Sequence, residues 1–144
     1  MTGQIRLGGA VLAARDNDGS TAEQYLAAAD AMADRTGEAT RVHWLSFGPV
    51  NVATHRVSTL VDQGLYAKAL DAAKSVRMPE DWPASRAAHF RAEIARAQLW
   101  TGRTDLAMQS LVTARQLAPQ QTRYSAGVRE TVAGLLSAKR SAPD

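Results

Sequence analysis

Gly64-Leu-Tyr-Ala-Lys-Ala69-Leu70 recurs 38 residues later as Gly102-Arg-Thr-Asp-Leu-Ala107-Met108. Each copy is a glycine, four residues, a small alanine and then a large apolar residue. Each copy stands between two segments whose apolar residues recur with the period of a helix. Self-similarity at a period of about 20–50 residues is typical of stacked helical hairpins. The repeat therefore predicts an all-α fold of antiparallel hairpins, and it favours binding over catalysis.

The glycines and alanines of the repeat have separate expected roles. Gly64 and Gly102 are expected to end the first helix of each hairpin in a left-handed conformation, which glycine adopts without a steric penalty. Ala69 and Ala107 are expected where the two helices cross, because a large side chain does not fit there. The hairpins therefore depend on small residues at fixed places.

About seven helices are predicted, in one domain that spans residues 1–144. They form hairpins near 3–36, 49–76 and 84–118, followed by a last helix near 125–140. Pro119 is expected to end the sixth helix. Met78-Pro-Glu-Asp-Trp-Pro83 is expected to be a linker, because its prolines cannot continue a helix. No segment alternates between apolar and polar residues as a strand does.

Residues 16–48 carry several local expectations. Gly19 is a candidate for a positive φ in the first turn. Ser20 or Thr21 is expected to cap the second helix, with Glu23 at capping-box spacing from Ser20. Gly37 is expected to end that helix, and residues 37–48 are expected to form a loop or a short helix.

Composition narrows the class of protein. The 17 basic and 14 acidic residues give a net charge of +3 and are interspersed, so charge alone indicates no nucleic-acid patch. The chain has no cysteine, which excludes disulfides and thiolate metal sites and favours a cytoplasmic location. Its apolar runs are much shorter than a membrane span, and its N-terminus lacks the layout of a signal peptide.

Catalytic and metal-binding patterns are weak. His43, His55 and His89 form no i,i+4 metal-ligand pair. Asp16-Asn-Asp-Gly19 resembles the start of a calcium loop, but Ala27 stands where the loop needs a glutamate. Gly8-Gly9 lies within a helical pattern and indicates close helix packing. No catalytic residue, metal or cofactor is expected, and a small all-helical enzyme is the remote alternative.

The hairpin near 84–118 resembles a tetratricopeptide repeat (TPR), because six residues fall at the offsets of that repeat: Ala95, Gly102, Ala107, Leu111, Ala114 and Pro119. The Gly64 hairpin matches less well, with Ala73 and Val76 at the next two key offsets. The first hairpin resembles a third copy with about two extra residues in its turn: Gly8, Ala22, Leu26 and Ala29. The resemblance implies a right-handed TPR-like solenoid.

A second resemblance is more specific. The segment Trp44-Leu-Ser-Phe-Gly-Pro-Val-Asn-Val-Ala-Thr-His-Arg-Val57 resembles the C-terminal, TPR-like half of actinobacterial helix-turn-helix regulators of the Xre type. Leu7-Gly-Gly-Ala-Val-Leu-Ala-Ala-Arg-Asp16 and Val128-Arg-Glu-Thr-Val-Ala-Gly-Leu-Leu136 are similar to other parts of that family. Those regulators carry an N-terminal DNA-binding domain and earlier repeats, which this sequence does not contain. Direct DNA binding is therefore not implied.

Two polar stripes are the candidate ligand- or partner-binding residues. If Gly64 sets the repeat register, one polar stripe of the third helix is predicted to face the concave surface of the solenoid: Asn51, Thr54, His55, Ser58 and Asp62. The matching stripe of the fifth helix holds His89, Glu93, Arg96 and Trp100. Asparagine and neutral histidine both donate and accept hydrogen bonds, which suits a peptide backbone.

Structural interpretations stay open beside these binding roles. Asn51 and His55 are equally well explained as a brace that ties the 37–48 loop to the hairpin. Arg56 is interpreted as a solvated or loop-pinning residue, with a ligand contact as the alternative.

The aromatic residues have structural interpretations as well. Trp44 and Phe47 are interpreted as core residues beneath the loop, with a platform for a ligand as the alternative. Trp82 is interpreted as a linker anchor. Trp100 fits either the core or a groove wall.

Two binding functions remain. The first is the ligand- or peptide-sensing and oligomerisation part of a transcriptional regulator. The second is a stand-alone TPR adaptor for a protein partner, such as a biosynthetic enzyme. Both use a protein, peptide or small-molecule partner and no membrane. The terminal repeats of a solenoid need a polar outer face, but the first helix carries the apolar residues Ile5 and Leu12. A homo-oligomer or hetero-complex is therefore expected through that helix.

Overall fold

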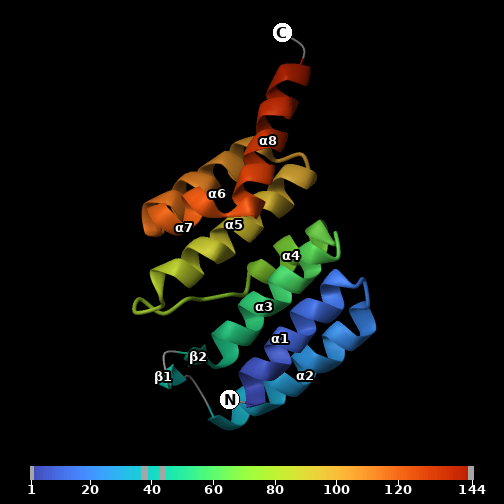
Figure 1. The fold of residues 1–144 in the computed structure, drawn as a ribbon, viewed down its shortest axis with the longest axis vertical. Helices are drawn as coiled ribbons and strands as arrows, with labels where there is room; N and C mark the ends of the chain where they lie inside the picture. Colours follow the sequence, from blue (N-terminus) through green and yellow to red (C-terminus); the bar gives the residue numbers. More distant parts are fainter. Residues whose placement is uncertain (1, 37–38, 43–44, 143–144) are drawn as a thin grey trace. The chain divides into compact units, whose positions relative to one another are not determined.

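The computed structural model describes residues 2–36, 39–42 and 45–142; for residues 36, 39–42 and 45–47 it describes the backbone alone. The chain forms two compact units, Met1–Met78 and Pro79–Asp144. The described part of each unit holds four helices, and the first unit adds two short strands (Figure 1). The all-α prediction is confirmed, and the single-domain organisation stays a prediction. No helix in the described ranges is long and apolar enough to cross a membrane.

The first unit consists of two helical hairpins. Its elements are α1 (Thr2–Arg15), α2 (Gly19–Thr36), β1 (Ala39–Val42), β2 (Leu45–Phe47), α3 (Pro49–Asp62) and α4 (Tyr66–Ala73). α1 packs against α2, α3 packs against α4, and α3 also contacts both α1 and α2. A core cluster joins the helices: Leu7, Ala10, Leu26, Ala29, Ala33 and Val52.

The second unit is built from α5 (Ala84–Trp100), α6 (Thr104–Leu117), α7 (Pro119–Tyr124) and α8 (Ala126–Ser141). The described elements therefore include eight helices and not seven, because residues 119–124 form a helix of their own after the expected break at Pro119. Proline suits the first turn of a helix, where its missing N–H has no partner to lose. Ser125 caps α8 by accepting a hydrogen bond from the Val128 N–H. The linker before α5 is non-helical, as predicted.

Three residues separate the two helices of every hairpin, and the turns share one backbone geometry. The middle positions have left-handed φ values, 60° at Asn17, 72° at Gly64 and 79° at Gly102. After each of them, an N–H donates to the carbonyl five residues back at 2.8–2.9 Å: Asp18 to Ala13, Leu65 to Leu60 and Arg103 to Gln98. This is the Schellman closure of a helix. The expected roles of Gly64 and Gly102 are confirmed.

Buried small residues stand at matching places around the three turns. Five residues after each left-handed residue comes an alanine with at most 1% exposure: Ala22, Ala69 and Ala107. Seven residues before each one comes another residue with at most 1% exposure: Ala10, Val57 and Ala95. The expectation of two extra residues in the first turn was wrong, because Asn17 takes the place that glycine takes in the other two.

The packing role expected for Gly8 and Gly9 holds for Gly9 alone. A Cβ at Gly9 would lie 3.1 Å from the Tyr25 ring, whereas a Cβ at Gly8 would meet nothing within 4 Å. Gly8 is exposed on α1. Ala10, and not Gly8, is buried at the place on this helix that matches Ala95 in the third hairpin, so the close packing expected at Gly8 was wrong.

The start of α2 differs from the expectation in two ways. Gly19 is the first helical residue, and the positive φ of this turn belongs to Asn17. The cap is Asp18, whose Oδ1 accepts hydrogen bonds from the Thr21 N–H and the Ser20 hydroxyl, both at 3.0 Å. Aspartate accepts as well as serine does at this place, and it stands two residues closer to α1 than Ser20 does. The capping roles of Ser20, Thr21 and Glu23 were therefore wrong.

The segment between α2 and α3 contains a short antiparallel β-hairpin. Ala39 pairs with Phe47 and Val42 with Leu45, with an irregularity in the register between them. The prediction of a loop or short helix without strands was wrong for these residues. Strands of three or four residues are too short to show alternation, although threonine, valine and phenylalanine favour them. The expected helix end at Gly37 lies outside the described residues.

Candidate binding surfaces

The predicted stripe of α3 begins with a buried asparagine. Asn51 is 1% exposed, and its Nδ2 donates to Gln4 Oε1 of α1 at 3.1 Å. At the other end of the stripe, Asp62 Oδ2 lies 3.6 Å from Arg15 Nε of α1. Both ends of the stripe therefore face α1, and Asn51 helps to hold the two helices together.

The middle of the stripe gathers around one backbone carbonyl. The Thr54 hydroxyl donates to the Asn51 oxygen at 2.9 Å, and His55 Nδ1 lies 2.8 Å from the same oxygen. Because a carbonyl only accepts, Nδ1 carries the proton, and Nε2 of a neutral ring is then an acceptor. Thr54, His55 and Ser58 are half-buried. The structure brings these residues together with Asn51, and their binding role stays a prediction.

Part of the loop-brace interpretation falls on residues that the structure does not describe. Trp44 and His43 lie outside the described residues, and Phe47 is described by its backbone alone. The contact between Asn51 and Gln4 is a brace to α1, which the sequence did not indicate. The brace to the loop stays a prediction.

The predicted stripe of α5 belongs to the second unit. Glu93 and Arg96 are half-buried, and His89 is exposed beside a small hollow of about 20 Å³ that Thr122 of α7 also lines. Trp100 is 64% exposed, so its interpretation as a core residue was wrong. The two stripes stand on different units, and each is a candidate surface by itself.

Trp82 is buried, which agrees with its interpretation as a linker anchor. Its backbone N–H donates to the Pro79 carbonyl at 3.1 Å, which closes a turn in the linker. The indole N–H is buried and has no hydrogen-bond partner among the described residues.

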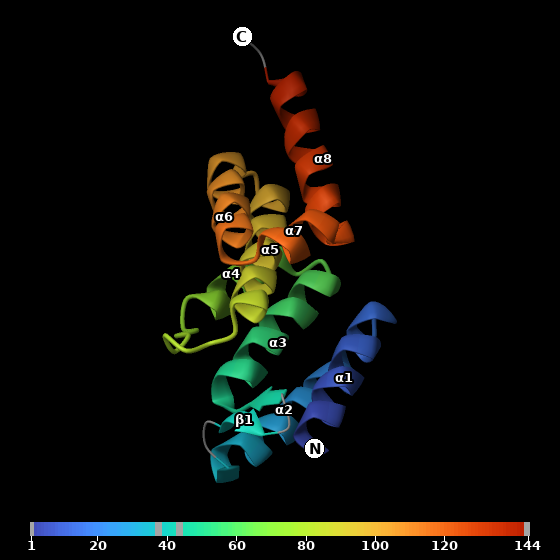
Figure 2. The same cartoon turned by 60° about the vertical axis from the view of Figure 1, so that its left-hand side comes forward.

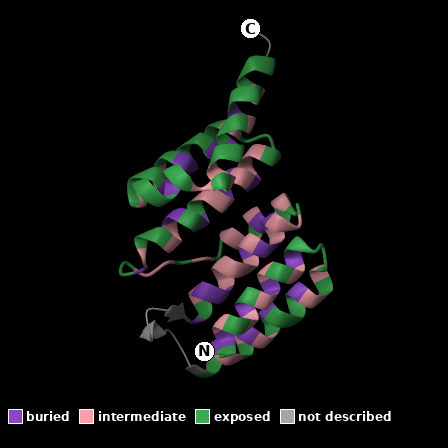
Figure 3. Ribbon diagram, viewed as in Figure 1, coloured by how far each residue is buried: buried purple, intermediate pink, exposed green. Residues whose placement is uncertain are grey.

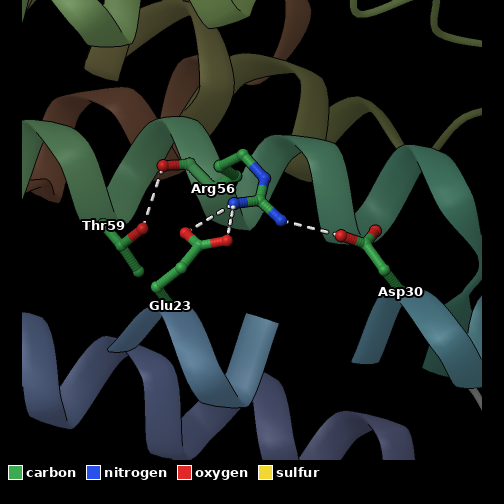
Figure 4. Close-up of polar contacts among 4 residues, drawn as sticks. All are labelled: Glu23, Asp30, Arg56 and Thr59. Atoms are coloured by element: carbon green, nitrogen blue, oxygen red, sulfur yellow. Dashed lines mark hydrogen bonds and ion pairs between the residues drawn. The ribbon is translucent and has the colours of Figure 1, made fainter. Parts of the chain in front are cut away.

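Arg56 forms a clamp between α3 and α2 (Figure 4). Its Nη1 donates to both carboxylate oxygens of Glu23 at 2.6 Å, and its Nη2 donates to Asp30 Oδ2 at 2.7 Å. Burial of the guanidinium group disfavours its charged form and lowers its pKa. The hydrogen bonds to the two carboxylates outweigh this effect, so the pKa of Arg56 is raised. The interpretation of Arg56 as solvated or loop-pinning was wrong, because both acids belong to α2.

The outer face of α1 exposes large apolar side chains. Ile5 is 69% exposed and Leu12 is 65% exposed. These two residues and Gly8 follow the i, i+3, i+7 spacing of one helical face. Gly8 leaves open space between them. We call Ile5, Gly8 and Leu12 the α1 face.

The second unit has an open groove between α6 and α8. One hollow of about 650 Å³ and another of about 470 Å³ share Val132 and Leu136 of α8 as lining residues. Arg115 of α6, Arg123 of α7 and Arg129 of α8 line the larger hollow. We call the combined surface the α6–α8 groove. Sequence reasoning missed it, although Val128, Val132 and Leu136 recur every four residues.

The excess of basic over acidic residues lies entirely in the second unit. Residues 1–78 hold eight basic and eight acidic residues, whereas residues 79–144 hold nine and six. The described residues include no group of three or more histidine, cysteine, aspartate or glutamate residues that could hold a metal ion. No protein-family model, curated protein or solved structure matches this chain.

Proposed function

We propose that this chain is a non-catalytic binding module of the TPR type, with its hairpins stacked as a right-handed solenoid. The observation that carries the proposal is the equivalence of the three turns. Asn17, Gly64 and Gly102 share a left-handed φ and are each followed five residues later by a buried alanine. A repeated hairpin cannot bury its apolar face alone, and this pattern therefore supports the proposal that the copies stack.

Within this class, the proposed role is the ligand- or peptide-sensing and oligomerisation part of a transcriptional regulator. The resemblance of residues 44–57 to Xre-type regulators supports this role. Thr54, His55 and Ser58 are the proposed sensing residues, because they are half-buried polar groups on one stretch of α3. DNA binding would belong to another domain of such a regulator.

The α1 face supports the oligomerisation role. Ile5 and Leu12 are mostly exposed although both are large and apolar. Each side chain gains about 1.5–3 kcal/mol when it is fully buried against a partner. We propose that a second copy of the chain covers this face.

Cysteine cross-linking tests this proposal, because the chain contains no cysteine. Leu12→Cys should give disulfide-linked dimers under mild oxidation at micromolar concentration. Ala27→Cys is the matched control, since residue 27 is exposed on α2. Equal cross-linking of the two variants would contradict a specific interface at α1.

The second candidate function is a TPR adaptor that binds a different protein. The α6–α8 groove favours it, because this groove is lined by residues of the second unit and by none of the α1 face. A helix-turn-helix segment in the same reading frame upstream would support the regulator. A separate gene with its own start would support the adaptor.

A further inference from the structure

We propose that the α6–α8 groove docks an acidic amphipathic helix of a partner protein. The groove belongs to the second unit, and the proposal does not depend on the α1 face or on the sensing residues of α3.

The floor of the groove is apolar and open. Val132 is 38% exposed and Leu136 is 53% exposed, and Val128 packs partly against the core of the unit. On the α6 side, Met108 lines the smaller hollow and is half exposed. Only Thr131 and Leu135 of α8 are buried among its described residues, and Figure 3 shows most of this helix as exposed. An apolar strip of this kind gains free energy when a partner covers it.

The larger hollow has a basic rim. Arg115, Arg123 and Arg129 come from three different helices and line the same space, and no acidic residue lines it. Within the described part of the chain, these guanidinium groups have no carboxylate partner; Arg123 lies 5.8 Å from the ring centroid of Tyr124. Between residues 104 and 142 the sequence holds five basic residues and two acidic residues; Asp105 lines the smaller hollow together with Lys139, and Glu130 lines neither hollow. The charge complement of this rim is a run of carboxylates.

The shape of the floor indicates a helix of about two turns. Val128 and Leu136 are eight residues apart on α8, which is about 12 Å at 1.5 Å per residue. A helix satisfies its own backbone hydrogen bonds, whereas an extended peptide would find no free strand edge on α6 or α8 to pair with. The C-terminal half of α8 extends beyond the α5–α6 hairpin in both views (Figures 1 and 2).

Two other anionic surfaces fit less well. A DNA backbone would neutralise the three arginines but would leave Val132 and Leu136 uncovered, because its phosphates and sugars are polar. An anionic bilayer is flat on this scale and cannot reach the lining of a concave groove. An acidic helix with one apolar face satisfies both the rim and the floor.

Selection from a displayed library of random 16-residue peptides tests the proposal on the full chain. Binders are to be selected on the wild-type chain alone, and the affinity of the enriched peptides for the wild type and for Arg115→Glu with Arg129→Glu is then measured by fluorescence anisotropy. We expect peptides rich in aspartate and glutamate, with apolar residues three or four apart. Their affinity should fall roughly tenfold or more in the double variant and should weaken as salt is added.

The controls separate the groove from general charge. Arg91→Glu with Arg103→Glu makes the same charge change on exposed residues outside the groove and should leave affinity within about twofold, whereas Leu136→Gln should weaken it. Circular dichroism checks that each variant is folded. Enriched peptides without net negative charge, or equal binding to both double variants, would overturn the proposal.

Two further outcomes would overturn it in favour of another occupant. One is binding of 20-base-pair duplex DNA or phosphatidylserine vesicles that Arg115→Glu with Arg129→Glu abolishes, when no acidic peptide is enriched. The other is self-association that this same double variant abolishes. Neither outcome bears on the proposed interface at the α1 face, because that interface is tested separately by Leu12→Cys.

Discussion

Arg56 of α3 donates to both oxygens of the Glu23 carboxylate on α2, with Nη1 at 2.6 Å from each oxygen. The second arm of the same guanidinium reaches Asp30, which lies seven residues, or about two turns, further along the same face of α2 (Figure 4). One side chain thus joins the first hairpin to the second. Thr59 follows Arg56 by one turn of α3, and its hydroxyl donates to the Arg56 carbonyl.

Removing this clamp should weaken the first unit by a modest amount. Arg56 retains 29% of its side-chain exposure and both acids are more exposed, so solvent screens the pairs. We expect Arg56→Ala to lower the free energy of unfolding by about 1 kcal/mol, and less in high salt. A double-mutant cycle with Glu23→Ala, followed by urea unfolding, measures the coupling. The exposed pair Lys74–Asp71 is the control and should give almost none.

The cap of α2 by Asp18 should make the stability of the first unit depend on pH in the acidic range. Hydrogen bonds from the Thr21 side chain and N–H, and from Ser20, lower the pKa of Asp18 from its ordinary value of 3.8. A carboxylate with a lowered pKa contributes its full stability above that ordinary value, and the contribution is lost as pH falls through the folded value. Thermal unfolding should therefore show a loss below pH 3.8 that Asp18→Asn does not share. Equal acid sensitivity in both proteins would argue against the cap.

The three turns should respond to substitution through their backbone. Nothing lies within 4 Å of a Cβ at Gly64 or Gly102, so alanine there tests φ alone. We expect each alanine variant, and Asn17→Ala, to lose about 1 kcal/mol, while Asn17→Gly should be nearly neutral. Gly8→Ala is the control: it lies in open space within α1 and should gain about 0.5–1 kcal/mol. Calorimetry of the set checks the order.

Asn51 should act mainly on stability. It is buried and donates to Gln4, so Asn51→Ala should lower the free energy of unfolding by about 1–3 kcal/mol. The exposed Gln24→Ala on α2 should change it by less than about 0.5 kcal/mol. Urea unfolding provides both values. If Asn51→Ala with His55→Ala left stability intact and abolished ligand binding, Asn51 would be a binding residue and not a brace.

Seven of the eight helices in the described residues and two of the three turns could be predicted from the sequence, whereas the short α7 after Pro119 could not. Gly64 and Gly102 are visible because glycine is the usual left-handed residue at a helix end, and the buried alanines follow at a fixed spacing. The third turn was misread because Asn17 takes the same φ without being a glycine. Asparagine tolerates this conformation, but it also occurs in many other turns.

The contacts across elements could not be predicted in the same way. Arg56 meets Glu23 from 33 residues away, and no local pattern links the two. The α6–α8 groove depends on how far α8 stands from α6, which helical spacing does not determine. Asp18 was missed as the cap because Ser20 and Glu23 offered a complete capping box nearby.

Sedimentation velocity of the full chain across a concentration series tests the central claim most directly. If the α1 face associates with a second copy, the chain should sediment as a species heavier than its 15.4 kDa monomer. Ile5→Glu with Leu12→Glu should return it to the monomer, while Gln24→Glu with Ala27→Glu on exposed positions of α2 should not. A wild-type chain that stays monomeric at the highest concentration, or an oligomer that both double variants retain, would contradict the claim.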